Sequence, residues 1–63
     1  MNETEKQIVA WLRDLAEAEF VLAKRVEGFP HSTLATVYSA SAETKLAVAN
    51  AIERGEHRDK QDG

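Results

Sequence analysis

Apolar residues recur every three or four positions through the first half of the chain. This repeat predicts one amphipathic helix from about residue 4 to residue 27, roughly six turns long at about 3.6 residues per turn. Its main apolar face consists of Ile8, Trp11, Leu12, Leu15, Ala18, Leu22 and Val26. Two capping boxes fit its start, Thr4 with Gln7 and Asn2 with Glu5, and both leave acidic residues in the first turn.

A turn over residues 28–32 separates this helix from a second one. Gly28 favours a left-handed C-terminal cap, Pro30 cannot continue a helix, and Ser32 is a good cap for the next helix. The second helix is predicted from about residue 33 to residue 54, where Gly55 stops it. Its apolar face consists of Leu34, Tyr38, Ala42, Leu46, Ala49 and Ile52, with Val37 and Val48 at the edge.

One point in the second helix leaves an alternative open. Ser41 could cap a separate third helix with Glu43 in its first turn. A continuous helix is favoured because the apolar repeat keeps its phase through residues 39–41. The tail over residues 56–63 has no apolar residue, so it is predicted to be disordered.

The two faces predict an all-α fold, an antiparallel helical hairpin over residues 1–55. Folding the chain back at the turn places Ile8 near Ala49, Leu15 near Ala42, and Leu22 near Leu34, so that large residues meet small ones. A single seam of this kind barely offsets chain entropy, whereas two hairpins make a four-helix bundle with a core. We therefore expect a dimer, in a layout similar to the dimeric hairpin regulators of plasmid copy number, typified by Rop.

The composition favours association with another protein chain, either a second copy or a different protein. A 63-residue chain without cysteine makes one marginally stable domain that cannot be stapled by disulfides. Between Gly28 and Ile52 the only charged residues are Glu43 and Lys45, so this helix lacks the charged outer face of a helix with one buried stripe. A second copy, or an unidentified protein partner, is expected to cover it.

A second, weaker apolar stripe runs beside the main face of the first helix, formed by Val9, Ala16, Phe20 and Ala23. It is either ordinary surface apolarity or a second contact surface, in which Val9 and Phe20 would touch a partner. Two charges also lie within the apolar faces, Glu19 and Lys45. They either extend to solvent at the edge of the seam or pair between subunits, because the predicted register does not bring them together within one chain.

The remaining composition excludes several functions. The net charge of −3 disfavours non-specific binding to nucleic acid, and no apolar run approaches the ~20 residues of a membrane span. The polar, acidic start does not resemble a secretory signal, so a cytoplasmic location is expected. His31 and His57 lie far apart and no nucleotide-binding loop is present, so no catalytic, metal or cofactor site and no enzymatic activity are predicted.

Two resemblances add to this interpretation. One segment resembles the helix-turn-helix of small phage and bacterial repressors. It spans residues 22–37, in which the Gly28 turn is followed by His31, Ser32, Thr33 and Thr36. That resemblance implies, as an alternative function, a DNA-binding regulator whose second helix reads the major groove. The whole chain, short and alanine-rich with a charged end, also resembles small accessory proteins of actinobacterial phages, which implies binding to a host or phage protein.

Overall fold

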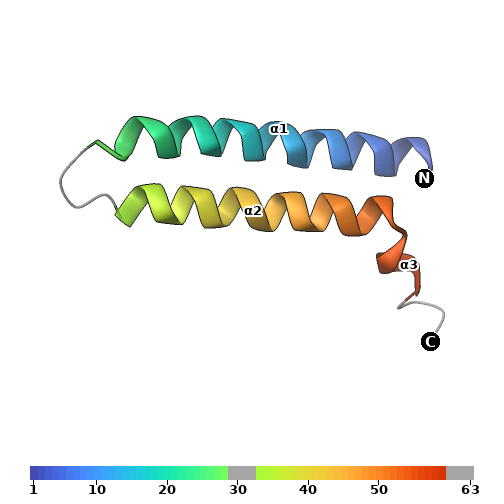
Figure 1. Ribbon diagram of the computed structural model, residues 1–63. Helices are drawn as coiled ribbons and strands as arrows, with labels where there is room; N and C mark the ends of the chain where they lie inside the picture. Colours follow the sequence, from blue (N-terminus) through green and yellow to red (C-terminus); the bar gives the residue numbers. More distant parts are fainter. Residues whose placement is uncertain (29–32, 60–63) are drawn as a thin grey trace.

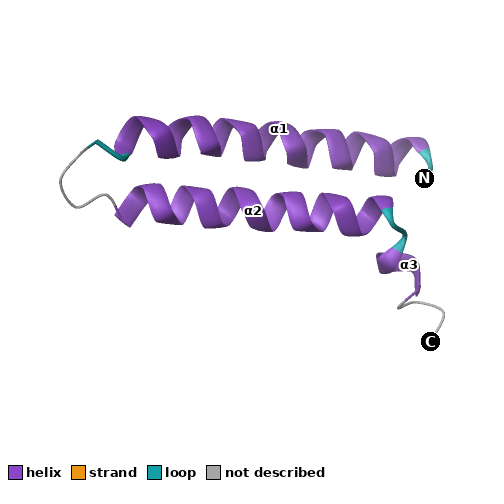
Figure 2. Ribbon diagram, viewed as in Figure 1, coloured by secondary structure: helices purple, strands orange, loops and turns teal. Residues whose placement is uncertain are grey.

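The chain forms two long antiparallel helices that lie side by side (Figure 1). The computed structural model describes residues 1–28 and 33–59, and everything described there is helix or short loop (Figure 2). Helix α1 spans Glu3–Val26, α2 spans Thr33–Glu53, and a four-residue helix, α3, spans Glu56–Asp59. The predicted all-α hairpin is therefore confirmed.

Local signals at the start of α1 act as the sequence indicates. The Asn2 side chain accepts a hydrogen bond from the Glu5 backbone N–H at 2.8 Å, and the Asn2 N–H donates to the Glu5 carboxylate at 3.0 Å. This is a complete capping box, so the Asn2 alternative is the one that forms. At the other end the cap residue is Glu27, in a right-handed conformation (φ −66°), so Gly28 does not supply the predicted left-handed cap.

Helix α2 runs through residues 39–41 without a break, which confirms the continuous helix over the alternative third helix. It ends where predicted, at Gly55, whose φ of 76° is left-handed and whose N–H donates to the Ile52 carbonyl at 3.0 Å. Residues 56–59 then form α3, so the predicted disorder is wrong for these four residues. Residues 60–63, and residues 29–32 of the predicted turn, lie outside the described part of the chain.

The seam between α1 and α2 is built from small side chains. The fully buried residues among those described are Val9, Ala16 and Ala23 on α1 and Ala42 and Ala49 on α2. On each helix these residues recur seven apart, the period of a coiled coil. The half-buried positions between them complete the two seams, with Leu12, Glu19 and Val26 on α1 and Ala35, Tyr38, Lys45 and Ile52 on α2.

The prediction that large residues of α1 meet small residues of α2 is therefore wrong. The hairpin closes through the weaker stripe, and the main apolar face of α1 is rotated out of the seam, leaving Ile8, Trp11 and Leu22 exposed. The physical reason is side-chain size, because alanine packed against alanine lets two helix backbones approach closely. No helix within the described residues is long and apolar enough to cross a membrane.

Candidate interaction surface

The main apolar face of α1 forms a stripe on the outside of the hairpin. Its members repeat at alternating steps of three and four residues, as a second coiled-coil seam would. Trp11 is 61% exposed, the highest value among the large hydrophobic side chains of the described chain. We call this the α1 stripe, formed by Ile8, Trp11, Leu15, Ala18 and Leu22.

Helix α2 carries a matching outward stripe. Leu34, Val37 and Val48 are each about half exposed or more, and with Ser41, Thr44 and Ala51 they form a row on α2 that lies beside its seam residues. No member of this row, the α2 stripe, is charged. The long α2 is short of charge because one of its faces packs on α1 and a second one is apolar but uncovered.

An ion pair shows that the two stripes share one broad face of the hairpin. Arg13 donates from Nη1 to the Glu53 carboxylate at 2.9 Å and from Nη2 to the Asn50 side chain at 3.0 Å, across the seam. Ile8 and Leu15 lie on the other side of the α1 seam from Arg13, seven residues apart in one row. Val48 and Ser41 likewise lie on the other side of the α2 seam from Glu53. Both stripes therefore occupy the face opposite this ion pair.

The predicted site residues divide between seam and surface. Leu12, Tyr38 and Ile52 are half-buried along the seam, and Leu46 is half-buried at its edge. Ile8, Trp11, Leu22 and Leu34 are exposed and Leu15 is half-buried, so these five do not form the core of a single hairpin.

The two residues predicted to touch a partner, Val9 and Phe20, lie in different parts of the hairpin. Val9 is only 3% exposed, so the prediction that it touches a partner is wrong: it lies in the seam, where it can contact only α2. Phe20 is 36% exposed. It lies seven residues from Arg13 and hence on the Arg13 face of the hairpin, away from the α1 stripe.

Glu19 and Lys45 pair within the chain, contrary to the sequence prediction. Lys45 Nζ lies 2.6 Å from Glu19 Oε1 and donates to Ser41 Oγ at 2.7 Å. Both side chains are mostly covered, with exposed fractions of 28% and 20%. The hydrogen bond from Lys45, followed by one from Ser41, lowers the pKa of the Glu19 carboxyl below its ordinary value. This is a paired charge at the centre of an alanine seam.

Helix α3 is held against the start of α1 through one carboxylate. Glu5, which already closes the α1 cap, also contacts the His57 imidazole Nε2 and the Arg58 guanidinium. The Arg58 hydrogen bond, with the backbone bond from Asn2 next, lowers the pKa of Glu5 to about 2 from 4.5. Sequence reasoning missed this contact because residues 5 and 58 meet only after the hairpin closes.

This contact predicts a specific loss of stability in acid. Because the pKa of Glu5 is depressed in the folded chain, its contribution is complete above pH ~4.5 and disappears as the pH falls towards ~2. Thermal unfolding followed by circular dichroism between pH 7 and pH 2 should show the midpoint falling more steeply in the parent than in an Arg58→Ala variant. Identical pH profiles for the two proteins would contradict the assignment.

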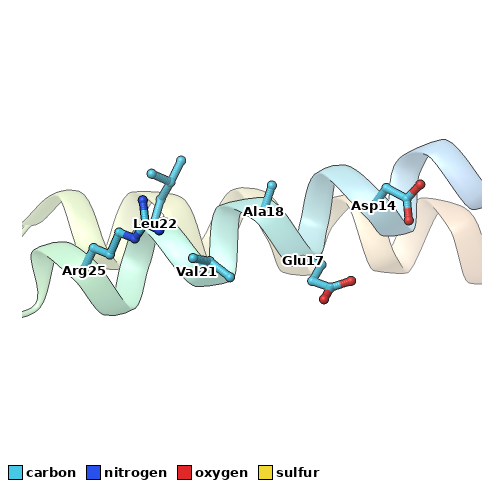
Figure 3. A pocket seen from close by; sticks show the side chains of 6 residues that line it. All are labelled: Asp14, Glu17, Ala18, Val21, Leu22 and Arg25. Carbon is cyan, nitrogen blue, oxygen red and sulfur yellow. The ribbon is translucent and has the colours of Figure 1, made fainter.

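Shallow hollows lie on the surface of the described residues, and two of them adjoin the apolar stripes. One follows the outer side of α1 and is lined by Asp14, Glu17, Ala18, Val21, Leu22 and Arg25 (Figure 3). Its walls come from one helix, with carboxylates towards one end and Arg25 at the other (Figure 3). The second hollow, which we call the α2–α3 hollow, lies between two helices and is lined by Val48, Ala51, Ile52, Glu56 and His57.

The helix-turn-helix resemblance depends partly on His31 and Ser32, which lie outside the described residues. Thr33 and Thr36 lie in the first turn of α2. An uninterrupted α2 is the arrangement expected of a hairpin, whereas a repressor needs a separate recognition helix. DNA binding therefore stays a prediction, with the continuous helix counting against it.

Across residues 1–28 and 33–59 no group of three or more His, Asp or Glu side chains could hold a metal ion. Comparison with known proteins found no family model, no curated protein and no solved structure that matches the chain. The molecule is defined by its fold class, an all-α helical hairpin, and by the apolar face it leaves open.

Proposed function

We propose that this chain is a non-catalytic protein-interaction module, a helical hairpin that self-associates into a four-helix bundle and presents the opposite face to another protein. In this arrangement the stripes on α1 and α2 are the surface for self-association. The face that carries Phe20 and the Arg13–Glu53 ion pair stays outward for the partner. A role as an accessory protein that modulates a host or phage protein fits this design.

One observation carries the proposal: the buried residues of the hairpin are mostly alanines, whereas several of its large apolar residues are exposed. Among the residues that the structure describes, the buried core consists of four alanines and one valine. Hydrophobic stabilisation scales with apolar area removed from water, at about 25 cal/mol per Å², and alanines supply little of it. Trp11, Leu22, Leu34 and Val37 would supply far more if covered. A small domain with this arrangement gains further stability by associating.

Light scattering after gel filtration tests the proposal. Over a concentration series, the chain of 7.0 kDa should elute as a dimer of about twice that mass. A Trp11→Asp variant should remain helical and become monomeric at concentrations where the parent is dimeric, because it places a charge in the centre of the apolar face. The expected loss is about 2 kcal/mol or more of association free energy, typical of a buried aromatic anchor.

Phe20→Asp is the matched control, since it changes another exposed aromatic residue of α1 on the opposite face of the hairpin. It should leave the dimer intact. A parent protein that is monomeric at every concentration, or a dimer that is lost equally in both variants, would contradict self-association through the α1 and α2 stripes.

A further inference from the structure

From the structure we infer how the two copies meet: Trp11 of each copy inserts into the α2–α3 hollow of the other, about a two-fold axis parallel to the helices. The occupant of the apolar face is thus a second copy of this chain, with α1 packed on the partner copy's α2. This inference rests on the proposed self-association and adds the geometry of the dimer. In that geometry both turns lie at the same end of the bundle.

The first argument is that Trp11 and the α2–α3 hollow lie at the same height along the helix axes. Arg13 bonds to Asn50 and Glu53, so the turn of α1 that carries Trp11 and Arg13 lies near residues 50–53 of the same chain. The α2–α3 hollow is lined by Val48, Ala51 and Ile52 at this same level. A two-fold axis parallel to the helices keeps every residue at its own level. It therefore brings each Trp11 to the other copy's hollow, reciprocally, as an isologous interface requires.

The rest of the face matches in the same register. Because both stripes keep the spacing of a coiled-coil seam, the apolar residues of one copy's α1 stripe run alongside the apolar residues of the other copy's α2 stripe. The two hydroxyl residues of the α2 stripe, Ser41 and Thr44, lie in the middle of that row.

Charge is compatible with this contact. The α2 stripe has no ionisable side chain, and the α1 stripe has none between residues 8 and 22. Arg25 follows at the turn end of the stripe, where the long side chain can reach solvent. The ionisable residues that line the α2–α3 hollow, Glu56 and His57, are already paired with Arg54 and Glu5 of their own chain. Covering this face therefore leaves no charged group buried without a partner.

The available area is sufficient for a stable dimer. Helix α1 has 24 residues, which makes the face about 36 Å long at ~1.5 Å per residue, and two helices side by side make it about 20 Å wide. Its projection is thus about 700 Å², and side-chain relief adds to the accessible area. Stable interfaces bury about 600–1,000 Å² per partner, so a second copy that covers this whole face falls within that range.

Spin labels near the turn test the geometry, because the chain has no cysteine of its own. A Cβ at Gly28 meets nothing within 4 Å, so a labelled Gly28→Cys variant disturbs no neighbour. With both turns at one end, the labels should lie within about 25 Å of each other, because helices in a bundle are only about 10 Å apart. If the turns lie at opposite ends, the separation is about the helix length, ~36 Å, or more.

Filling the hollow gives a second, independent measurement. Ala51→Leu should weaken the dimer about ten-fold and shift the fluorescence of Trp11, the single tryptophan, towards that of a solvent-exposed indole. Ala47→Leu adds the same side chain at an exposed position outside the α2 stripe and should change neither. Circular dichroism establishes that both variants keep the parent helicity.

The outcomes separate the two proposals. A short label distance together with a dimer weakened by Ala51→Leu supports the inference. A dimer with a long label distance, or one that tolerates Ala51→Leu, overturns the inference and leaves the proposed function standing. A parent protein that is monomeric throughout the concentration series overturns both, and leaves the face open to a different protein.

Discussion

The Ala42→Leu substitution is expected to lower the free energy of unfolding by about 1–3 kcal/mol, the usual cost of adding methylenes to a packed core. Ala42 has no exposed surface and lies at the centre of the α2 seam. A leucine side chain there would have no free space, because the alanine side chain is already completely covered. Denaturant unfolding of parent and variant at one protein concentration measures the difference.

The effect should depend on the seam and not on leucine itself. Ala47→Leu, on an exposed position of the same helix, should change the free energy of unfolding by less than about 0.5 kcal/mol, as exposed substitutions generally do. If Ala42→Leu were as stable as the control, the alanine residues would not set the spacing of the helices, and the seam described above would be wrong.

The Lys45→Leu substitution is expected to lower the thermal midpoint by several degrees at pH 7. Lys45 is the cation 2.6 Å from Glu19 Oε1, and that oxygen is shielded from solvent. Without Lys45 the carboxylate would remain in an apolar seam with no opposite charge, which is among the more damaging changes a core can undergo. Circular dichroism melts of the parent and the variant measure the loss.

The pH dependence and a double substitution identify the cause. In the parent, the Lys45 hydrogen bond lowers the pKa of Glu19, so the parent loses stability as Glu19 is protonated in acid. In Lys45→Leu the pKa of Glu19 should rise, so protonation favours the folded variant and the difference between the two proteins narrows as the pH falls. Combining Glu19→Leu with Lys45→Leu should restore most of the midpoint, because a fitted apolar pair can replace an ion pair. No recovery in either experiment would contradict this explanation.

The two apolar surfaces of α1 have different physical roles. The inner one, with Val9, Ala16 and Ala23, brings the helices close together but removes little apolar area from water. The outer one, with Trp11 and Leu22, retains most of the area and stays exposed in the single chain. Hairpin closure and association therefore use separate faces, which is why the proposed dimer can be broken by Trp11→Asp without unfolding each hairpin.

Local features of the sequence determined the elements and most of their limits. Asn2 and Glu5 cap α1 because the groups involved lie within one turn of each other. Gly55 ends α2 because glycine adopts a positive φ at little cost. The unbroken apolar repeat through residues 39–41 was sufficient to indicate one continuous α2. These interactions join groups that are only a few residues apart. They therefore form regardless of what the helix packs against, and the sequence alone predicts them.

The choice of the packing face was decided by the tertiary structure. Ile8 and Val9, one position apart, both begin stripes with helical spacing, and periodicity alone does not say which stripe meets α2. The stripe with the larger residues was predicted to meet α2, but the stripe with the smaller residues does so. Which stripe is buried depends on how closely two helices approach, and that depends on both partners together: the alanines of α2, Ala42 and Ala49, fit against the small stripe of α1.

The same dependence applies to the polar contacts. Glu19 with Lys45, Arg13 with Glu53, and Glu5 with Arg58 join positions 26, 40 and 53 residues apart in the chain. A rotation of either helix by a fraction of a turn changes which side chains meet, so the wrong stripe also implied the wrong pairs. The sequence by itself determined that this protein is a capped helical hairpin with more apolar surface than one hairpin buries. Only the tertiary structure decided which part of that apolar surface remains exposed, because burial is a property of the pair of helices and not of either helix alone.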